Sequence, residues 1–317
     1  MRSPRAALPL LELALLLAAA LFALAFQLTL PSRLPSEADH RAAAAALARE
    51  ARPGDVVLLF PWWTERARLF LPPALPVVGY FGSDADALDS HPRIWVLAQP
   101  QLPRADEAGF AEAFLPGRTP LAAPRRFGPL TLTPYANGRH RPRHFDAVQA
   151  LARAHVYLES PQGVRLPCPF DGTAHRCPGP PHLRVAAEWH EVAYQPRHCL
   201  WMHPPGGAQR LVAEFDAGPA ELPEGSALRL GAGLVWEHAR AVDPRRISAT
   251  QVTAQAGELP PLQLELPPGR EGMQWREQPL PPGPAPRVRV AVQAERAQTR
   301  WVCIELQALQ APSERAP

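Results

Sequence analysis

The sequence contains no lysine, a single asparagine (Asn137) and only three isoleucines among its 317 residues. All 33 basic residues are therefore arginine, which indicates the coding bias of a GC-rich genome rather than a phosphate-binding surface. The net charge is +3 with both signs interspersed, so no nucleic-acid partner is expected. Proline is in excess, at 41 residues, and this excludes a mostly helical protein because each interior proline removes a helix hydrogen bond.

The N-terminus predicts a membrane segment over residues 1–31. Arg2 and Arg5 precede the apolar run Ala6–Leu30, which is long enough to cross about 30 Å of hydrocarbon. The arginine pair favours a cytoplasmic N-terminus and an exported remainder. A cleaved signal peptide is the alternative, with residues 23–25 as a small-x-small site. We favour the uncleaved anchor, because the apolar run continues beyond that site. Either reading places the soluble part in the periplasm or outside the cell.

The four cysteines agree with export. Cys168 and Cys177 flank a short loop and are expected to pair locally, which leaves Cys199 and Cys303 for a long-range bridge. The alternative is zinc coordination by these thiols and nearby histidines, but their spacing fits no standard ligand pair. We therefore expect two disulfides, no metal site and no cofactor.

Residues 35–137 predict a small α/β domain. An alanine-rich helix follows a capping box at Ser36–Asp39, and Val56–Phe60 is a continuous apolar run typical of a buried parallel strand. Strands that alternate with helices indicate a small Rossmann-like sheet. The strands are expected at 56–60, 76–80, 93–97 and 127–132, and the helices at 36–52, 64–71 and 105–114.

Two features of this domain allow a functional reading. Asp84–Asp86 has the D-x-D form that can hold a divalent metal, but a helix cap or turn explains it equally well. Trp62 and Trp63 follow the first strand, where open α/β sheets place ligands, so an exposed ring there is able to stack on a sugar. We favour packing beneath the following helix for both tryptophans.

The stretches "ARPGDVVLLFP", "RIWVLAQ" and "FGPLTLTPY" make residues 6–137 resemble the end of protein-mannosyltransferase-type, polyprenyl-phosphate-dependent glycosyltransferases. In that family the last membrane helix precedes an extracytoplasmic α/β domain. The resemblance implies a glycan context. It carries over no catalytic residue, because those enzymes hold their catalytic acids between earlier membrane helices and this chain has one such helix.

The remainder divides into a linker and connecting helix at 138–155, a β-sandwich at 156–308 and a tail at 309–317. Short alternating segments separated by glycine and proline predict a sandwich or jelly roll. The alternating valines of 287–293 are the clearest example. Nine strands are expected, at 183–194, 197–202, 209–215, 227–238, 249–256, 261–266, 271–277, 287–293 and 300–306.

The cysteines also give a hypothesis about strand register. Facing residues of an antiparallel pair have a constant index sum. If Cys199 faces Cys303, then Trp201 faces Trp301, because both sums equal 502. A bridge requires the two cysteine Cα atoms to lie within about 7 Å.

The segments "RHCLWMHPP", "LRLGAGLVWEHAR" and "RWVCIEL" make residues 183–308 resemble galactose-binding-like β-sandwiches found beside carbohydrate enzymes. The resemblance implies sugar binding through aromatic platforms. We assign Trp201 and Trp301 as the preferred pair, with Trp236 and His203 as further carbohydrate-binding candidates. The alternative is that these tryptophans fill the sandwich core or its edges.

Together these observations predict a single-pass membrane protein with a small α/β domain and a β-sandwich. Its expected role is non-catalytic binding or accessory work in cell-envelope glycan handling. The alternatives are a glycoside hydrolase or glycosyltransferase-related enzyme, and a structural envelope scaffold. No nucleophile-elbow, zincin, Walker or dinucleotide motif occurs. A carboxylate pair drawn from Glu188, Glu191 and Glu237 remains open, since hydrolysis requires two acids about 5–9 Å apart.

Overall fold

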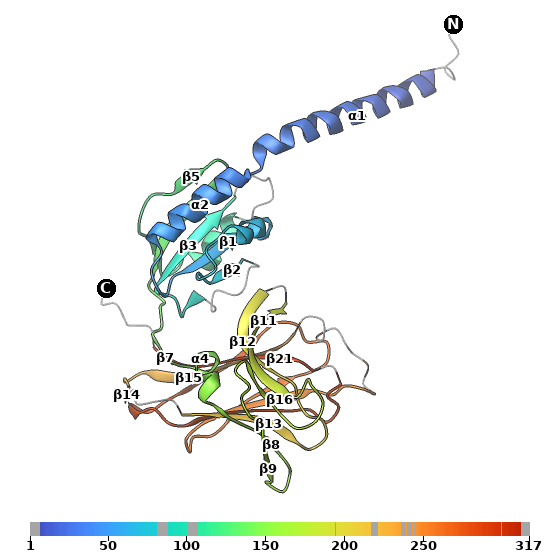
Figure 1. Ribbon diagram of the computed structural model, residues 1–317. Helices are drawn as coiled ribbons and strands as arrows, with labels where there is room; N and C mark the ends of the chain where they lie inside the picture. The colour runs from blue at the N-terminus through green and yellow to red at the C-terminus, as the bar shows by residue number, and fades with distance from the viewer. Residues whose placement is uncertain are drawn as a thin grey trace. The chain divides into compact units, whose positions relative to one another are not determined.

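The chain folds into two compact units, one comprising residues 1–83 and 93–136 and the other residues 84–92 and 137–317 (Figure 1). The computed structural model describes residues 7–80, 88–99, 107–193, 195–216, 221–235, 239, 243, 245–298 and 300–311.

The chain begins with a long apolar helix, α1, from Ala7 to Arg33. Its segment Glu12–Leu30 has a mean hydropathy of 2.4 and no buried residue. At 1.5 Å per residue these 19 residues extend about 28 Å, which matches the hydrocarbon thickness of a bilayer. By length and composition the segment can cross a membrane, and a signal sequence would meet the same criterion.

Helix α2, from Glu37 to Glu50, begins at the predicted capping box. The Ser36 side chain accepts from the Asp39 backbone, and the Asp39 carboxylate accepts from the Ser36 backbone at 2.8 Å. The Ser36 hydroxyl also donates to this carboxylate at 2.7 Å, and this hydrogen bond, followed by that from the Ser36 backbone, lowers the pKa of Asp39. His40 is buried on the inner side of α2, stacked on Phe70 with ring centroids 5.0 Å apart, and neither ring nitrogen has a hydrogen-bond partner. Burial lowers the pKa of His40.

The first unit contains a mixed six-stranded sheet. Its strands are β1 (Val56–Phe60), β2 (Val77–Gly79), β3 (Arg93–Ala98), β4 (Arg118–Pro120), β5 (Arg125–Phe127) and β6 (Leu130–Asn137). The order is β2-β1-β3-β6-β4, with β5 also pairing with β6. β1 runs parallel to both β2 and β3, and β6 is antiparallel to β3. All five residues of β1 are buried, as its uninterrupted apolar pattern predicted.

Asp55, at the entry to β1, fixes the start of this sheet. Its carboxylate is 2% exposed and forms an ion pair with Arg93 of the neighbouring strand at 2.6 Å. The same carboxylate accepts from the Trp95 indole nitrogen at 2.8 Å and from the Arg52 backbone at 2.9 Å. The turn that ends α2 is therefore tied to β3 by one buried carboxylate.

Two short helices flank the sheet, η2 (Trp62–Leu69, of 3-10 type) and α3 (Glu107–Phe114). Trp63 is half-buried and its indole nitrogen donates to the carbonyl oxygen of Gln99 at 3.3 Å, so it has a packing role. Trp62 differs, because 60% of its side chain is exposed. The two tryptophans therefore have different environments although they are adjacent in sequence.

The second unit is a sandwich of two antiparallel sheets (Figure 1). One sheet consists of β7 (Arg143–Asp146), β10 (Ala174–Arg176), β11 (Arg184–Val192), β12 (Gln195–Met202), β15 (Ser226–Leu234), β18 (Gln274–Pro279) and β21 (Val302–Gln310). The other consists of β8 (His155–Glu159), β9 (Arg165–Pro167), β13 (Arg210–Phe215), β16 (Thr250–Ala256), β17 (Leu262–Leu266) and β20 (Val288–Gln293). The short strands β14 (Glu221–Leu222) and β19 (Gly283–Pro284) pair separately.

The strand orders are β10-β11-β12-β21-β15-β18, with β7 beside β21, and β17-β16-β20-β13-β8-β9. Each of the nine strands predicted from alternation has a counterpart. The connecting helix expected within 138–155 is different. Strand β7 lies in this segment, and the short helices α4 (Ala147–Ala150) and η4 (Leu151–Arg153) follow it. The strands β7 to β10 lacked an alternating apolar pattern that would identify them.

The main core lies between the two sheets. Alternate residues of facing strands contribute to it, and their opposite neighbours lie outside. The alternating valines of β20 lie in this core, and so do three alternate apolar residues of β21; the six are Val288, Val290, Val292, Val302, Ile304 and Leu306.

Both expected disulfides form. Cys168 and Cys177 have Cα atoms 4.1 Å apart, and Cys199 and Cys303 have Cα atoms 5.4 Å apart, inside the required limit. The predicted register is wrong by two residues. Trp201 faces Cys303, and each facing pair of β12 and β21 has an index sum of 504 rather than 502. Cys199 and Cys303 are therefore diagonal neighbours on the two strands and not directly opposite each other. A shift of two leaves every side chain on the same face, which is why the bridge survives it.

Candidate functional site

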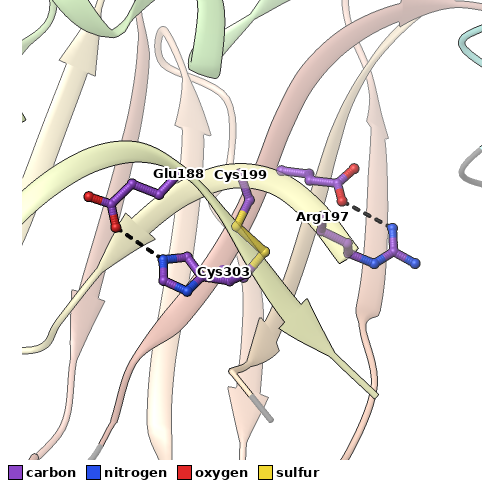
Figure 2. The surroundings of a disulfide bond; sticks show 6 residues. Glu188, Arg197, Cys199 and Cys303 are labelled. Atoms are coloured by element: carbon purple, nitrogen blue, oxygen red, sulfur yellow. Dashed lines mark hydrogen bonds and ion pairs between the residues drawn. A yellow bond between two sulfur atoms is a disulfide. The ribbon is translucent and has the colours of Figure 1, made fainter. Parts of the chain in front are cut away.

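The candidate site lies on the outer face of the seven-stranded sheet, around the Cys199–Cys303 disulfide (Figure 2). Gln195, Arg197, Cys199 and Trp201 are alternate residues of β12 and therefore share a face. Of their neighbours on the strand, Leu200 and Met202 point into the main core. This outer face would ordinarily be polar and solvated, yet all four residues are buried.

A second, small apolar cluster explains the burial. It is formed by the disulfide together with Trp201, Val192 and Val235, and Met273 and Trp301 pack against it. Because the cluster covers this part of the sheet, only 3% of Trp201 is exposed.

Trp201 and Trp301, the predicted pair, do come together. Their ring centroids are 5.4 Å apart in an edge-to-face arrangement. The pair forms through side-chain packing rather than through the strand register that had been expected, because Trp301 precedes β21. Trp301 is half-buried, so of the two rings it is the one that remains accessible to a ligand. A direct stacking role for Trp201 stays a prediction.

Charged groups flank the disulfide on both sides. Glu188 lies on one side, 2.9 Å from Arg184 and 3.2 Å from the Nε2 atom of His190. On the other side, Arg197 forms an ion pair with Glu305 at 3.0 Å. Figure 2 shows these groups to either side of the sulfur atoms. The ion pairs fix the side-chain orientations before any ligand arrives.

A third tryptophan, Trp275 of β18, lies across the same face. It faces Gly231 of β15, and a Cβ atom at Gly231 would come within 2.2 Å of the indole ring. The ring therefore packs directly on the glycine backbone. The guanidinium carbon of Arg229 lies 4.0 Å from the ring centroid and that of Arg197 lies 5.9 Å away, so two cations border one half-buried indole.

Two buried polar groups on this face have no hydrogen-bond partner among the residues that the structure describes. The amide of Gln195 is 3% exposed, and neither its oxygen nor its nitrogen is bonded. The indole nitrogen of Trp201 also lacks an acceptor. A buried polar atom without a partner costs about 1–3 kcal/mol, so its persistence requires an explanation such as a bound molecule.

Other candidates lie elsewhere. His203 is buried, with its ring centroid 4.4 Å from that of His182. Trp189 is 58% exposed and stacks on His198 at 5.2 Å, on the opposite face of β11 from Glu188. Trp236, Glu237, Asp84 and Asp86 lie outside the described residues.

The structure also limits the chemistry open to this face. Glu188 and Glu191 are three positions apart on an extended strand, so their side chains point to opposite faces of the sheet and do not form an acid pair. Among the described residues, no group of three or more histidines, cysteines or carboxylates is placed to hold a metal ion.

Sequence reasoning did not single out Gln195 or Arg197, and it counted Trp275 among the available tryptophans without preferring it. The one signal for Trp275 was the pair of glycines in "LGAGL", since a glycine within a strand often marks the close approach of another group. Nothing in the local sequence distinguishes Gln195 from a solvated glutamine.

No family model and no curated protein matches the chain. Among solved structures, the xylan-binding module CBM15 is 11% identical, with a TM-score of 0.28 and coverage of 51% of this chain and 93% of that module. TmCBM61 in complex with beta-1,4-galactotriose is 9% identical, with a TM-score of 0.24 and coverage of 52% and 94%. The xylan-binding domain from CBM 22 is 12% identical, with a TM-score of 0.20 and coverage of 51% and 98%. At these values no residue of this chain is matched to a ligand contact of those modules.

Proposed function

We propose that the protein is a membrane-anchored, extracytoplasmic and non-catalytic glycan-binding protein, and that it binds glycan on the outer face of the seven-stranded sheet. The observation that carries this proposal is the buried amide of Gln195, which has two unpartnered atoms and lies on the sheet face that also holds half-buried tryptophans.

The chemistry of this face suits a saccharide. A pyranose ring has an apolar face that packs on indole, and Trp275 and Trp301 are half-buried on this side of the sandwich. Its hydroxyls both donate and accept, as a primary amide does, so one glutamine can bond two neighbouring hydroxyls. Arg197 is held by Glu305 and offers further fixed donors.

The proposed location rests on separate features. An apolar helix of sufficient length precedes the folded units, and two disulfides tie the sandwich. Disulfides persist in oxidising compartments outside the cytosol. Within this proposal the α/β unit is Rossmann-like and related to the tail domain of protein-mannosyltransferase-type enzymes, as the segments quoted above suggest.

The test is a glycan array probed with the full-length chain in lipid nanodiscs. Trp301→Ala and Trp275→Ala should each weaken the binding of any captured glycan at least about tenfold, which corresponds to about 1.4 kcal/mol. Trp189→Ala is the matched control, because Trp189 is exposed on the other face of the same sheet. Binding that is lost in Trp189→Ala and kept in the other two variants would contradict the proposed face.

A further inference from the structure

A separate cleft opens at the β9 edge of the six-stranded sheet of the sandwich. It has a volume of about 570 Å³ and lies between η4, the strands β8 and β9, and the loop that follows β9. This volume falls within the range of small-ligand sites, about 300–1,000 Å³. The residues used below are Arg153, Tyr157, Arg165, Phe170 and His175, all of which line it.

One wall of the cleft is rigid. The loop that carries Phe170 is closed by the Cys168–Cys177 disulfide. His175 is buried beneath this loop, with its ring nitrogens 3.0 Å from the Cys168 carbonyl oxygen and 2.9 Å from that of Leu151. The Phe170 ring packs on His175 with centroids 4.9 Å apart, yet 38% of Phe170 remains exposed. The loop therefore presents an aromatic side chain in a fixed position.

The charge of the cleft is positive. Arg153 and Arg165 line it, and none of the described residues that line it carries a carboxylate. The carboxylates of Glu159 and Glu214 lie nearby, 3.6 and 3.9 Å from Arg165. Both are shared with further arginines.

Those further arginines are Arg210, 2.7 Å from Glu159, and Arg289, which lies 2.6 Å from Glu159 and 3.7 Å from Glu214. With Arg165 they make three cations against two carboxylates. Arg153 forms no ion pair with any residue that the structure describes and adds another positive charge.

The side chain of Arg165 packs on the ring of Tyr157. Its guanidinium carbon lies 4.5 Å from the centroid of the Tyr157 ring, and the Tyr157 hydroxyl donates to Glu214. Burial and this hydrogen bond raise the pKa of Tyr157 to about 12, so the phenol remains a neutral donor. A guanidinium lying on a fixed ring keeps donors at its edge for a planar anion.

We propose that this cleft binds the carboxylate of a hexuronate residue, so that the protein recognises an acidic glycan at a second site. Arg153 and Arg165 would pair with the carboxylate, and Phe170 would pack on the apolar face of the pyranose ring. The choice of a saccharide rests on the function proposed above, whereas the preference for an anion rests on the charges of this cleft alone.

The experiment measures binding of trigalacturonate and of neutral galactotriose to the full-length chain in nanodiscs, by isothermal titration calorimetry at low and high salt. Trigalacturonate should bind at least tenfold more tightly than galactotriose, and its affinity should fall as salt rises. Arg153→Gln and Phe170→Ala should each reduce that affinity at least about fivefold. Arg287→Gln is the control, since this exposed arginine pairs with Asp216 away from the cleft.

The possible outcomes separate this proposal from the previous one. Equal affinity for the two trisaccharides, or trigalacturonate binding unchanged in Arg153→Gln, would overturn the acidic-glycan site. Displacement of trigalacturonate by an equal concentration of inorganic phosphate would overturn its saccharide component. Loss of trigalacturonate binding in Trp275→Ala would assign the ligand to the sheet face instead. Retention in that variant, with loss in Arg153→Gln, would support the cleft whether or not the sheet face binds any glycan.

Discussion

Replacing Gln195 by methionine tests whether its amide is retained for a ligand rather than for the fold. Both amide atoms are buried without partners, so the folded protein bears the cost of their desolvation. Methionine has nearly the same shape and no polar group to satisfy. Gln195→Met should therefore raise the free energy of unfolding by about 1–2 kcal/mol. For a unit of this size that corresponds to a rise in Tm of about 2–8 °C.

The same substitution should weaken glycan binding, so stability and affinity should change in opposite directions. Thermal unfolding of the oxidised full-length chain, followed by circular dichroism, gives the first quantity, and titration with a glycan captured on the array gives the second. Gln255→Met is the matched control, because the Gln255 amide donates to the Leu259 carbonyl at 3.0 Å and its loss should leave stability unchanged or lower. A clear decrease in Tm for Gln195→Met would refute the reasoning, since it would make the amide a structural group.

Three further predictions concern stability. Replacing Cys199 and Cys303 by alanine should cost about 4–5 kcal/mol in denaturant unfolding, because this bridge closes a loop of 104 residues. Burial lowers the pKa of His40, so the folded α/β unit binds a proton at His40 less readily than the unfolded chain does. Its stability should therefore be greatest above pH 6.5, the ordinary pKa of histidine, and should fall as the pH drops below that value. His40→Gln should flatten this dependence in unfolding measured between about pH 7.5 and 5. Asp55→Ala should destabilise the α/β unit by about 3–5 kcal/mol in chemical unfolding, because it removes the buried carboxylate that pairs with the Arg93 guanidinium. An unchanged unfolding midpoint would contradict this and would show that water replaces the carboxylate.

Hydrophobic periodicity was sufficient to predict much of the fold. The alternation around Val290 and Ile304 identifies strands and assigns their faces, and the uninterrupted apolar run at Val56–Phe60 identifies a strand buried on both sides. The same periodicity cannot distinguish registers that differ by two residues. The register was therefore inferred from the cysteines, on the assumption that Cys199 faces Cys303, and that assumption was wrong because Trp201 faces Cys303. Short polar strands such as Arg165–Pro167 have no buried face and leave no pattern.

The candidate site was less predictable for a related reason. Its residues converge from β12, β15, β18 and β21, so their proximity depends on the order of strands and not on any local motif. The burial of Trp201 arises from the additional apolar cluster on a face that alternation marks as external. The Gln195 amide is buried without a hydrogen-bond partner among the described residues, and that is a property of tertiary packing.

The position of the last strand has a consequence for biogenesis. β21 pairs with β12, β15 and β7, so this strand occupies the interior of its sheet and also supplies Cys303. Until residue 302 and those after it have been delivered, β12 and β15 each present an unpaired edge, and Cys199 has no thiol to join. A chain interrupted shortly before its end would thus lack the middle of one layer. The seven-stranded sheet can therefore be completed only once the residues of β21 are available, and its pairing depends on contacts distant in sequence.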